Sequence, residues 1–274
     1  MERHPSAWPT RFSSISAYAR MPKKDRITLP YLTAAEIRGP AAAKARAALE
    51  GHFGDAAGIG AAFIERWRSE LPLFSELHAL DCGTASGYFA EELGRIGIRT
   101  IAAVDIDDYR ASEIRERGLI RDFQTADLSS DPLPWPDASF DLVTAWCVLP
   151  HLENPFHFVR EVARVLKPGG IFFWSMPNVA SLLSRKNFLR SGELERYSTK
   201  NNHIAIFTPA LVEKIFSPAF RIRAREYTLD IAKLRQSRFG WLKVAGAQRV
   251  WFGRERFRAW FGTDILYACT KRDA

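Results

Sequence analysis

Short apolar segments alternate with longer amphipathic segments between about residues 77 and 175 of the chain. The short segments have the length of buried strands, whereas the longer ones carry apolar residues at helical spacing. We expect strands at 77–81, 100–105, 123–126, 140–145 and 170–175. We expect helices at 88–95, 109–117 and 155–165. This alternation is typical of βαβ units, which build a parallel sheet with helices on its faces.

The residues before 77 predict helices rather than strands. Residues 34–49 are rich in alanine, and residues 61–71 place apolar side chains at helical spacing, with a glycine-rich loop at 51–60 between them. The first 30 residues mix basic residues with prolines and match neither a signal peptide nor a clean transit helix. We therefore expect a basic, loosely ordered segment at 1–30 and a helical cap at 31–75.

The residues after 176 are expected to complete the main domain, which spans 76–274. Thr208 and Pro209 have the residue types of a helix start, and this helix runs to Phe216. Residues 221–229 and 264–270 have the pattern of two late strands. Two further segments, at about 177–208 and 230–263, are longer than the connections require, and we expect them to be inserts on the substrate side.

Basic residues are concentrated near the C-terminus. Residues 221–274 hold thirteen Lys or Arg and five Asp or Glu, which accounts for the whole net charge of +8. This uneven distribution disfavours nucleic acid as a general partner and indicates a local anionic one, such as a phosphorylated substrate or anionic lipid. Aromatic residues interleave with arginines at 238–261. Three interpretations stay open: a helix that packs its aromatic residues onto the core, peripheral contact with a membrane or lipid, and contact with nucleic acid, which is the least favoured.

The cysteine pattern and the lengths of the apolar segments bear on location. Cys82, Cys147 and Cys269 lie far apart, which favours small buried side chains over disulfides, and no metal site is expected. Every apolar stretch is interrupted well before 18 residues, so no membrane-spanning helix is predicted. We expect a cytoplasmic protein, with a peripheral position at the inner face of a membrane as the alternative.

Small residues at 80–88 connect a predicted strand to a predicted helix. This context, with glycines at Gly83 and Gly87, lets the backbone approach a ligand at the carboxyl edge of a sheet. Asp105 ends the next strand, eighteen residues beyond Gly87, where a carboxylate can accept hydrogen bonds from both hydroxyls of a ribose. Asp127 follows the third strand. The pattern predicts a site for a nucleoside-containing cofactor.

These segments, together with residues 140–143 and 160–170, resemble class I S-adenosylmethionine-dependent methyltransferases over about residues 77–175. Residues 175–178, His203 and residues 207–209 are similar to the small-molecule branch that includes ubiquinone O-methyltransferases. The resemblance implies a doubly wound, Rossmann-like α/β fold with a seven-stranded, mostly parallel sheet, a reversed last strand and helices on both faces. It also implies S-adenosylmethionine as the cofactor.

The resemblance implies a role for each residue of the predicted site. Asp81, Gly83 and Gly87 would shape the loop around the methionine part of the cofactor, and Asp105, followed by Ile106, would hold the ribose. Asp127 would reach the adenine amine with Leu128 beside the ring, and Trp146 would line the pocket. The chain departs from the family at Ala85, where a glycine is usual. We expect this alanine to alter the loop geometry modestly, and loss of cofactor binding is the alternative.

Two histidines are candidates for a general base. His151 follows the fourth strand at the carboxyl edge of the sheet, and His203 lies in the first insert. A base is needed where the methyl acceptor is an alcohol or phenol, which must lose a proton. The alternatives are a histidine that caps or packs at a helix start for His151, and an ordinary surface-loop histidine for His203.

The predicted reaction is methyl transfer to oxygen of a small-molecule or lipid- or sugar-linked acceptor. A nicotinamide dehydrogenase is disfavoured because Gly-x-Gly-x-x-Gly is absent, with Ala85 and Tyr88 at two of its glycine positions. An amino methyltransferase acting on nucleic acid bases is disfavoured because residues 145–148 lack the Pro-Pro-aromatic arrangement of that class. Two alternatives remain: a catalytically inactive homologue that serves as a partner subunit, and an RNA methyltransferase.

Overall fold

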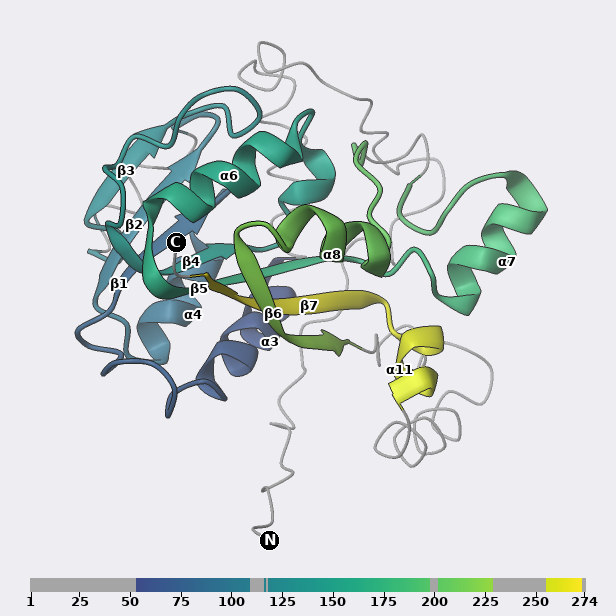
Figure 1. Ribbon diagram of the computed structural model, residues 1–274, viewed down its shortest axis with the longest axis horizontal. Helices are drawn as coiled ribbons and strands as arrows, with labels where there is room; N and C mark the ends of the chain where they lie inside the picture. The colour runs from purple at the N-terminus through teal and green to yellow at the C-terminus, as the bar shows by residue number, and fades with distance from the viewer. Residues whose placement is uncertain (1–52, 109–115, 117, 198–201, 229–254, 273–274) are drawn as a thin grey trace, which may run out of the picture.

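One twisted sheet of seven strands forms the centre of the protein. The computed structural model describes residues 53–108, 116, 118–197, 202–228 and 255–272. The strands are β1 (His78–Cys82), β2 (Thr100–Asp105), β3 (Asp122–Thr125), β4 (Phe140–Ala145), β5 (Leu166–Pro177), β6 (Phe220–Tyr227) and β7 (Asp264–Lys271). Their order is β3-β2-β1-β4-β5-β7-β6, and only β7 pairs antiparallel to its neighbours (Figure 1). The predicted doubly wound sheet with a reversed last strand is confirmed.

Helices cover both faces of the sheet (Figure 1). One face packs against α3 (Phe53–Glu65) and α4 (Tyr88–Arg95), whose apolar residues join one buried cluster. The other face packs against α6 (Pro155–Val165) and α8 (Pro209–Phe216) in a second cluster. Successive side chains of a strand point to opposite faces, so Phe172 and Trp174 of β5 belong to the second cluster, whereas Ile171 and Phe173 belong to the first.

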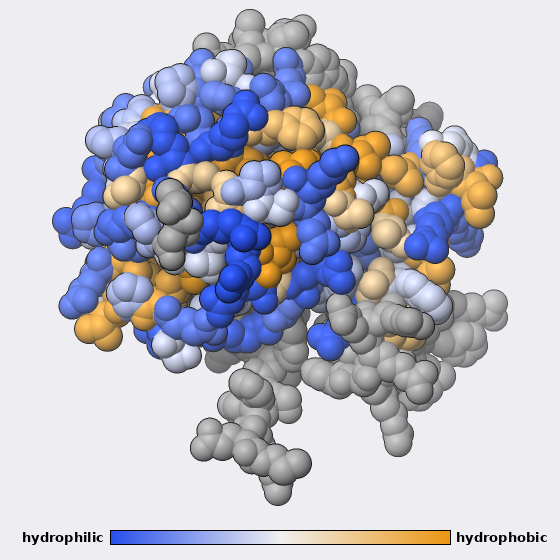
Figure 2. Space-filling model, viewed as in Figure 1, coloured by the Kyte–Doolittle hydropathy of each residue, from blue (hydrophilic) through white to orange (hydrophobic). Residues whose placement is uncertain are grey.

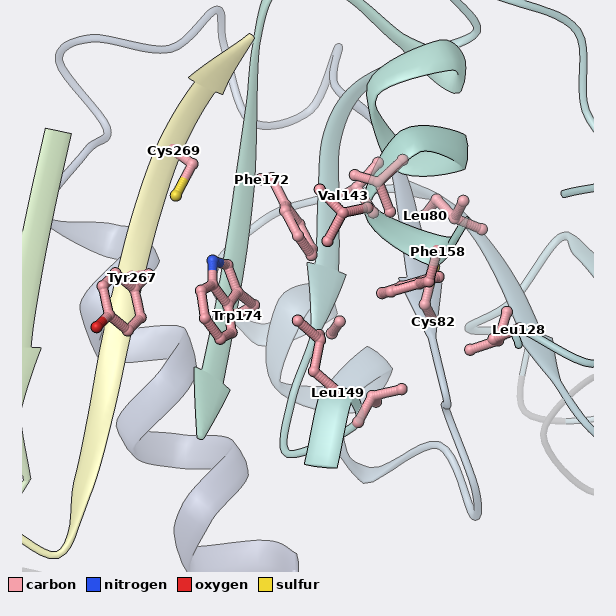
Figure 3. Close-up of a cluster of buried hydrophobic side chains, with 14 of the residues drawn as sticks. Leu80, Cys82, Leu128, Val143, Leu149, Phe158, Phe172, Trp174, Tyr267 and Cys269 are labelled. Carbon is pink, nitrogen blue, oxygen red and sulfur yellow. The ribbon is translucent and has the colours of Figure 1, made fainter. Parts of the chain in front are cut away.

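Aromatic stacking joins the antiparallel part of the sheet to its parallel part. Trp174 of β5 stacks on Tyr267 of β7, with ring centroids 4.5 Å apart and an interplanar angle of 9° (Figure 3). The same indole stacks on Phe216 of α8 at 4.8 Å. Trp174, Tyr267 and Phe216 are all fully buried. These contacts fix where β7 lies against β5 and therefore where the segments at its two ends emerge.

The parallel strands bring their carboxyl ends to one edge of the sheet. In the register of β1, Cys82 lies opposite Val104 of β2 and Ala145 of β4. The segments that follow these three strands must therefore lie side by side. The sequence places residues 83–87, Asp105 and Trp146 in these segments, so the fold gathers most of the predicted site at one edge.

The three cysteines are free, as predicted. Cys82 and Cys269 are buried, and Cys147 is partly buried with its Sγ atom 3.3 Å from Ser175 Oγ. Burial raises the pKa of each thiol, to about 12 for Cys269. These cysteines therefore act as small apolar side chains. No helix in the described ranges is long and apolar enough to cross a membrane.

The predicted boundaries near the N-terminus are wrong. Residues 51–60 were expected to form a loop and 61–71 a helix, but α3 covers Phe53–Glu65 and turns follow it. The reason is packing, because the Gly60 backbone lies against the side chains of Phe89 and Trp146 and no larger residue would fit there. Glycine is here the residue that allows a helix to approach closely, although its intrinsic helix propensity is low.

Several predicted segments lie outside the described residues. These are the basic segment at 1–30, the helix at 34–49, most of the helix at 109–117 and most of the insert at 230–263. The insert at 177–208, predicted without a regular strand, contains the helix α7 (Leu182–Ser191). The end of the other insert contains α11 (Glu255–Phe261).

The packing of α3 is tested by Gly60→Ala beside Gly58→Ala. A methyl group at Gly60 would lie 2.5 Å from Phe89 Cε2 and 2.7 Å from the Trp146 ring, whereas one at Gly58 meets nothing within 4 Å. We expect Gly60→Ala to lower the free energy of unfolding by about 1–3 kcal/mol through overpacking. Gly58→Ala should raise it by about 0.5–1 kcal/mol through helix propensity. Urea denaturation measures both, and equal effects would contradict the assigned packing.

Candidate cofactor-binding site

The loop between β1 and α4 has a left-handed backbone at three positions. The φ angles are 69° at Gly83, 47° at Ala85 and 77° at Gly87. A Cβ atom at Gly83 would lie 2.5 Å from Val148 Cγ2, so glycine is also required there for close packing. Ala85 is exposed and carries a methyl group in a conformation that favours glycine. The family's usual glycine at this position is therefore explained by the backbone itself.

The end of β2 holds this loop in place. The N–H groups of Gly83 and Thr84 donate to Val104 O at 2.8 and 3.4 Å. The Ala85 N–H donates to Asp105 Oδ2 at 2.7 Å, and the Ile106 N–H donates to Asp105 Oδ1 at 2.7 Å. A carboxylate oxygen can accept more than one hydrogen bond, so Asp105 retains acceptor capacity for ligand hydroxyls.

Asp81 is a buried carboxyl group whose charge is only partly compensated. Its Oδ1 accepts a hydrogen bond from Thr144 Oγ1 at 2.7 Å, which links β1 to β4. Its Oδ2 and the hydroxyl of Thr84 are buried without a hydrogen-bond partner among the described residues. Burial, with a contribution from the negative charge of Asp105, raises the pKa of Asp81 to about 6. A bound cationic N–H donor at this loop would compensate the charge and lower that pKa.

The segment after β3 places Asp127 and Leu128. Asp127 Oδ1 accepts a hydrogen bond from the Ser129 N–H at 2.8 Å, and the Asp127 N–H donates to Asp131 Oδ2. The carboxylate is thus oriented by its own turn. Leu128 is only 7% exposed and packs into the core (Figure 3). The predicted contacts of these two residues with an adenine ring remain predictions.

Trp146 packs on the helices of one sheet face. Its ring stacks on Phe89 of α4 with centroids 5.0 Å apart and an interplanar angle of 11°, and Gly60 of α3 lies against both. Phe89 and Gly60 were not predicted as site residues, although the glycines at 54, 58 and 60 are a signal of close helix packing. Trp146 therefore anchors α3 and α4 behind the loop, and its predicted role in lining the pocket remains a prediction.

The two predicted histidines lie together. His151 ends the 3₁₀-helix η4 (Leu149–His151) that follows β4, and the ring of His203 lies 4.5 Å away in an edge-to-face arrangement. The insert is attached at this point, because the N–H groups of Ile204 and Ala205 donate to Pro150 O at 2.8 and 3.0 Å. Tyr197 flanks His203 at 5.2 Å and donates its hydroxyl to Ala205 O.

Burial keeps both imidazoles neutral. It lowers the pKa of His151 to about 4 and that of His203 to about 3, to which the neighbouring His151 also contributes. Asn202 forms hydrogen bonds with His151, but His151 Nδ1 is buried with no partner among the described residues. A neutral imidazole nitrogen can accept a proton or a hydrogen bond. The edge thus combines two carboxylates with a pair of uncharged bases.

Comparison with known proteins finds a family match over part of the chain. Residues 80–174, from the middle of β1 into β5, match the family model described as "Methyltransferase domain". Within this range lie the left-handed loop, Asp105, Asp127, Trp146 and His151. Over these residues the chain is similar to S-adenosylmethionine-dependent methyltransferases.

The curated proteins that match this part of the chain are named for different activities. A probable S-adenosylmethionine-dependent methyltransferase of Mycolicibacterium smegmatis is 37% identical over 99 residues, which cover 36% of this chain and 37% of that protein. A ubiquinone biosynthesis O-methyltransferase of Caulobacter vibrioides is 32% identical, covering 36% and 40%. The arginine-hydroxylase NDUFAF5 of Rattus norvegicus is 30% identical, covering 47% and 37%. The chain therefore spans less than half the length of these curated relatives.

A solved structure supports the fold of the domain. The S-adenosylmethionine-dependent methyltransferase of Mesorhizobium loti superposes with a TM-score of 0.51 at 19% identity, covering 75% of this chain and 95% of that one. The names of these relatives identify S-adenosylmethionine as the cofactor of those proteins. The described residues fit this cofactor, since left-handed glycines open the loop and Asp105 offers acceptors for hydroxyls. The buried Asp81 carboxyl group, whose charge is only partly compensated, suits a cationic ligand.

The role of Asp105 is tested by Asp105→Ala beside Asp108→Ala, which removes an exposed carboxylate three residues further on. Loss of Asp105 removes two charged acceptors for the ribose hydroxyls and frees the Ala85 N–H. We expect the dissociation constant of S-adenosylmethionine to rise at least about a hundredfold, because each lost hydrogen bond to the carboxylate contributes roughly 1.5–3 kcal/mol. Calorimetric titration measures it, and Asp108→Ala should bind as the intact protein does. Equal binding by all three proteins would refute the assignment.

The strain at Ala85 is tested by Ala85→Gly beside Ala138→Gly. Ala138 is also left-handed, with a φ of 54°, but it lies in the loop before β4. We expect each change to raise the free energy of unfolding by about 1 kcal/mol, since relief of strain exceeds the entropic cost of glycine. Only Ala85→Gly should also lower the dissociation constant of S-adenosylmethionine, because the ligand can approach the backbone more closely. Denaturation and calorimetry distinguish the two, and a destabilised Ala85→Gly protein would contradict this account.

Proposed function

We propose that this protein transfers a methyl group from S-adenosylmethionine to an oxygen atom of a small-molecule or lipid- or sugar-linked acceptor. When bound, the cofactor supplies an electrophilic methyl group on a sulfonium centre. The observation that carries the proposal is the pair of neutral histidines, His151 and His203, at the carboxyl edge that also bears the cofactor loop.

The histidine pair suits an acceptor that must lose a proton. An alcohol or phenol is a poor nucleophile while protonated, and a positioned imidazole can take the proton as the new bond forms. Both imidazoles are uncharged at neutral pH, so a ring nitrogen of His151 or His203 can accept that proton. Their lowered pKa also makes them weaker bases than a free imidazole, so the transfer would have to accompany formation of the new bond. The loop held by Asp105 would fix one reactant while the histidines orient the other, and such alignment can supply about 7–11 kcal/mol of the barrier reduction.

A measurement of methyl transfer distinguishes this proposal from two alternatives. The similarity to a protein named arginine-hydroxylase shows that relatives of this domain carry other activities in their names. A cofactor-binding homologue that acts only as a partner subunit would bind S-adenosylmethionine and never transfer its methyl group. An RNA methyltransferase would use RNA and reject small phenols and alcohols.

The role of the histidines is tested by labelled methyl transfer from S-adenosylmethionine to a panel of phenols, alcohols, amines and RNA. We expect oxygen acceptors to be methylated, and His151→Gln to lower the single-turnover rate by about 10²–10⁴-fold while cofactor affinity changes little. The rate should stay constant from pH 8 to about 5 and fall below it, because the lowered pKa of His151 keeps the base form present until about pH 4.

His78→Gln is the matched control, because this exposed histidine begins β1 at the opposite edge of the sheet. It should leave both the rate and its pH profile unchanged. His203→Gln shows which imidazole takes the proton. Turnover that is unaffected by either substitution at the pair would contradict the proposed base, and cofactor binding without any transfer would favour the partner-subunit alternative.

A further inference from the structure

The helix α7 exposes an unusual set of side chains. Leu182, Leu183, Phe188 and Leu189 are between 38% and 87% exposed, with Leu189 at the upper end. Arg185, Lys186 and Arg190 are exposed on the same helix, which contains no acidic residue. Figure 2 shows hydrophobic and hydrophilic surface side by side over this helix, at the side of the molecule where α7 projects. An ordinary surface helix turns its apolar face inward, and α7 does the opposite.

Polar contacts fix α7 in this orientation. Ser184 is fully buried, and its Oγ accepts a hydrogen bond from the Glu195 N–H at 3.1 Å. Asn187 Nδ2 donates to Glu195 Oε2 at 2.7 Å, and Ser181 Oγ caps the helix by accepting from the Ser184 N–H. The face that α7 turns towards the protein is therefore small and polar. Its apolar and basic face is held towards solvent by specific hydrogen bonds.

The helix α11 extends the same surface. It contacts α7, and the buried side chain of Asn178, just before α7, donates to Ala259 O at 2.8 Å and Gly262 O at 3.0 Å. Trp260 and Phe261 of α11 are 48% and 45% exposed. The two helices lie at one side of the molecule (Figure 1). We name this area the α7–α11 surface and define it by Leu182, Leu183, Lys186, Leu189, Arg190 and Trp260.

The α7–α11 surface adjoins the edge of the sheet that bears the cofactor loop. Strand β5 runs parallel to β4, and α7 begins a few residues after β5 ends at Pro177. The start of α7 is therefore at the carboxyl edge, as are residues 83–87 and His151. A flat partner that contacted α7 and α11 would lie beside this edge.

We propose that the α7–α11 surface binds the headgroup layer of an anionic lipid bilayer. Leucines and a tryptophan require an apolar phase, and Lys186 and Arg190 require phosphate or another anion within the same few ångströms. The boundary between lipid headgroups and acyl chains supplies both, and peripheral helices with this composition bind there. RNA offers phosphates but no apolar phase for Leu189, so it meets only half of the requirement. This inference does not depend on which atom the enzyme methylates.

Vesicle co-sedimentation of the full chain tests the proposal. The probes are vesicles of phosphatidylcholine alone and of phosphatidylcholine mixed with phosphatidylglycerol. The apolar variant is Leu183→Ser with Leu189→Ser, and its control is Leu73→Ser, which changes a leucine that is 69% exposed elsewhere. The charge variant is Lys186→Gln with Arg190→Gln, and its control is Arg99→Gln with Arg121→Gln, two exposed arginines away from both helices.

We expect the intact protein to bind the vesicles that contain phosphatidylglycerol and to bind phosphatidylcholine at least about tenfold more weakly. Each α7 variant should lose at least about tenfold in affinity for the anionic vesicles, and each control should stay within about twofold. Affinity for S-adenosylmethionine, measured in parallel, should be the same in all variants, which shows that they are folded.

Three results would overturn the proposal. The first is that the intact protein binds both vesicle types equally or binds neither. The second is that both α7 variants still bind the anionic vesicles, which would place the binding surface elsewhere in the chain. The third is evidence that the α7–α11 surface binds something else. This would be a dimer that dissociates when Leu183→Ser and Leu189→Ser are introduced together. It would also be salt-sensitive RNA binding that the charge variant loses, in a protein that does not bind vesicles. None of these results bears on methyl transfer, so this proposal and the proposed function fail independently.

Discussion

The hydrogen bonds between the end of β2 and the loop after β1 are the constraint on which the site depends. Val104 O and the carboxylate of Asp105 together accept three consecutive N–H groups, from Gly83 to Ala85. These bonds hold a chain of left-handed residues that would otherwise have many conformations. Because the loop is fixed, α4 begins at a defined point, and Phe89 of this helix reaches the ring of Trp146. The loop geometry and the packing of one sheet face are thus determined together.

The electrostatics of the carboxyl edge follow from burial. Asp81 and Asp105 place negative charge beside the loop. Burial raises the pKa of Asp81 more than its hydrogen bond from Thr144 lowers it, so the protein compensates its charge only in part. The histidines have the opposite response, because burial lowers their pKa and leaves them neutral. The edge therefore favours a cationic ligand on one side and a proton-losing acceptor on the other. This division of charge is consistent with the proposed transfer from a sulfonium to an oxygen atom.

The sequence predicts the parallel part of the fold well, because each strand there is a short apolar run. The ranges 100–105 and 140–145 agree with β2 and β4, and the helices at 88–95 and 155–165 agree with α4 and α6. Gly83, Gly87 and Asp105 follow from the same local patterns. The contact between His151 and His203 could not be predicted, since it depends on the backbone of the insert bonding to Pro150 O. The start of α3 could not be predicted because the close packing of Gly60 outweighs its low helix propensity. The orientation of α7, with its apolar side chains towards solvent, depends on a hydrogen bond from Glu195, which lies beyond the helix.

A crystal structure with S-adenosylhomocysteine, the demethylated product of the cofactor, tests the central claim most directly. The account predicts difference density along residues 83–87, with the ribose hydroxyls donating to Asp105 and the adenine ring beside Asp127 and Leu128. It also predicts that the backbone of the loop stays in the left-handed conformation described here. Density at another part of the molecule, or a ribose that does not contact Asp105, would contradict it.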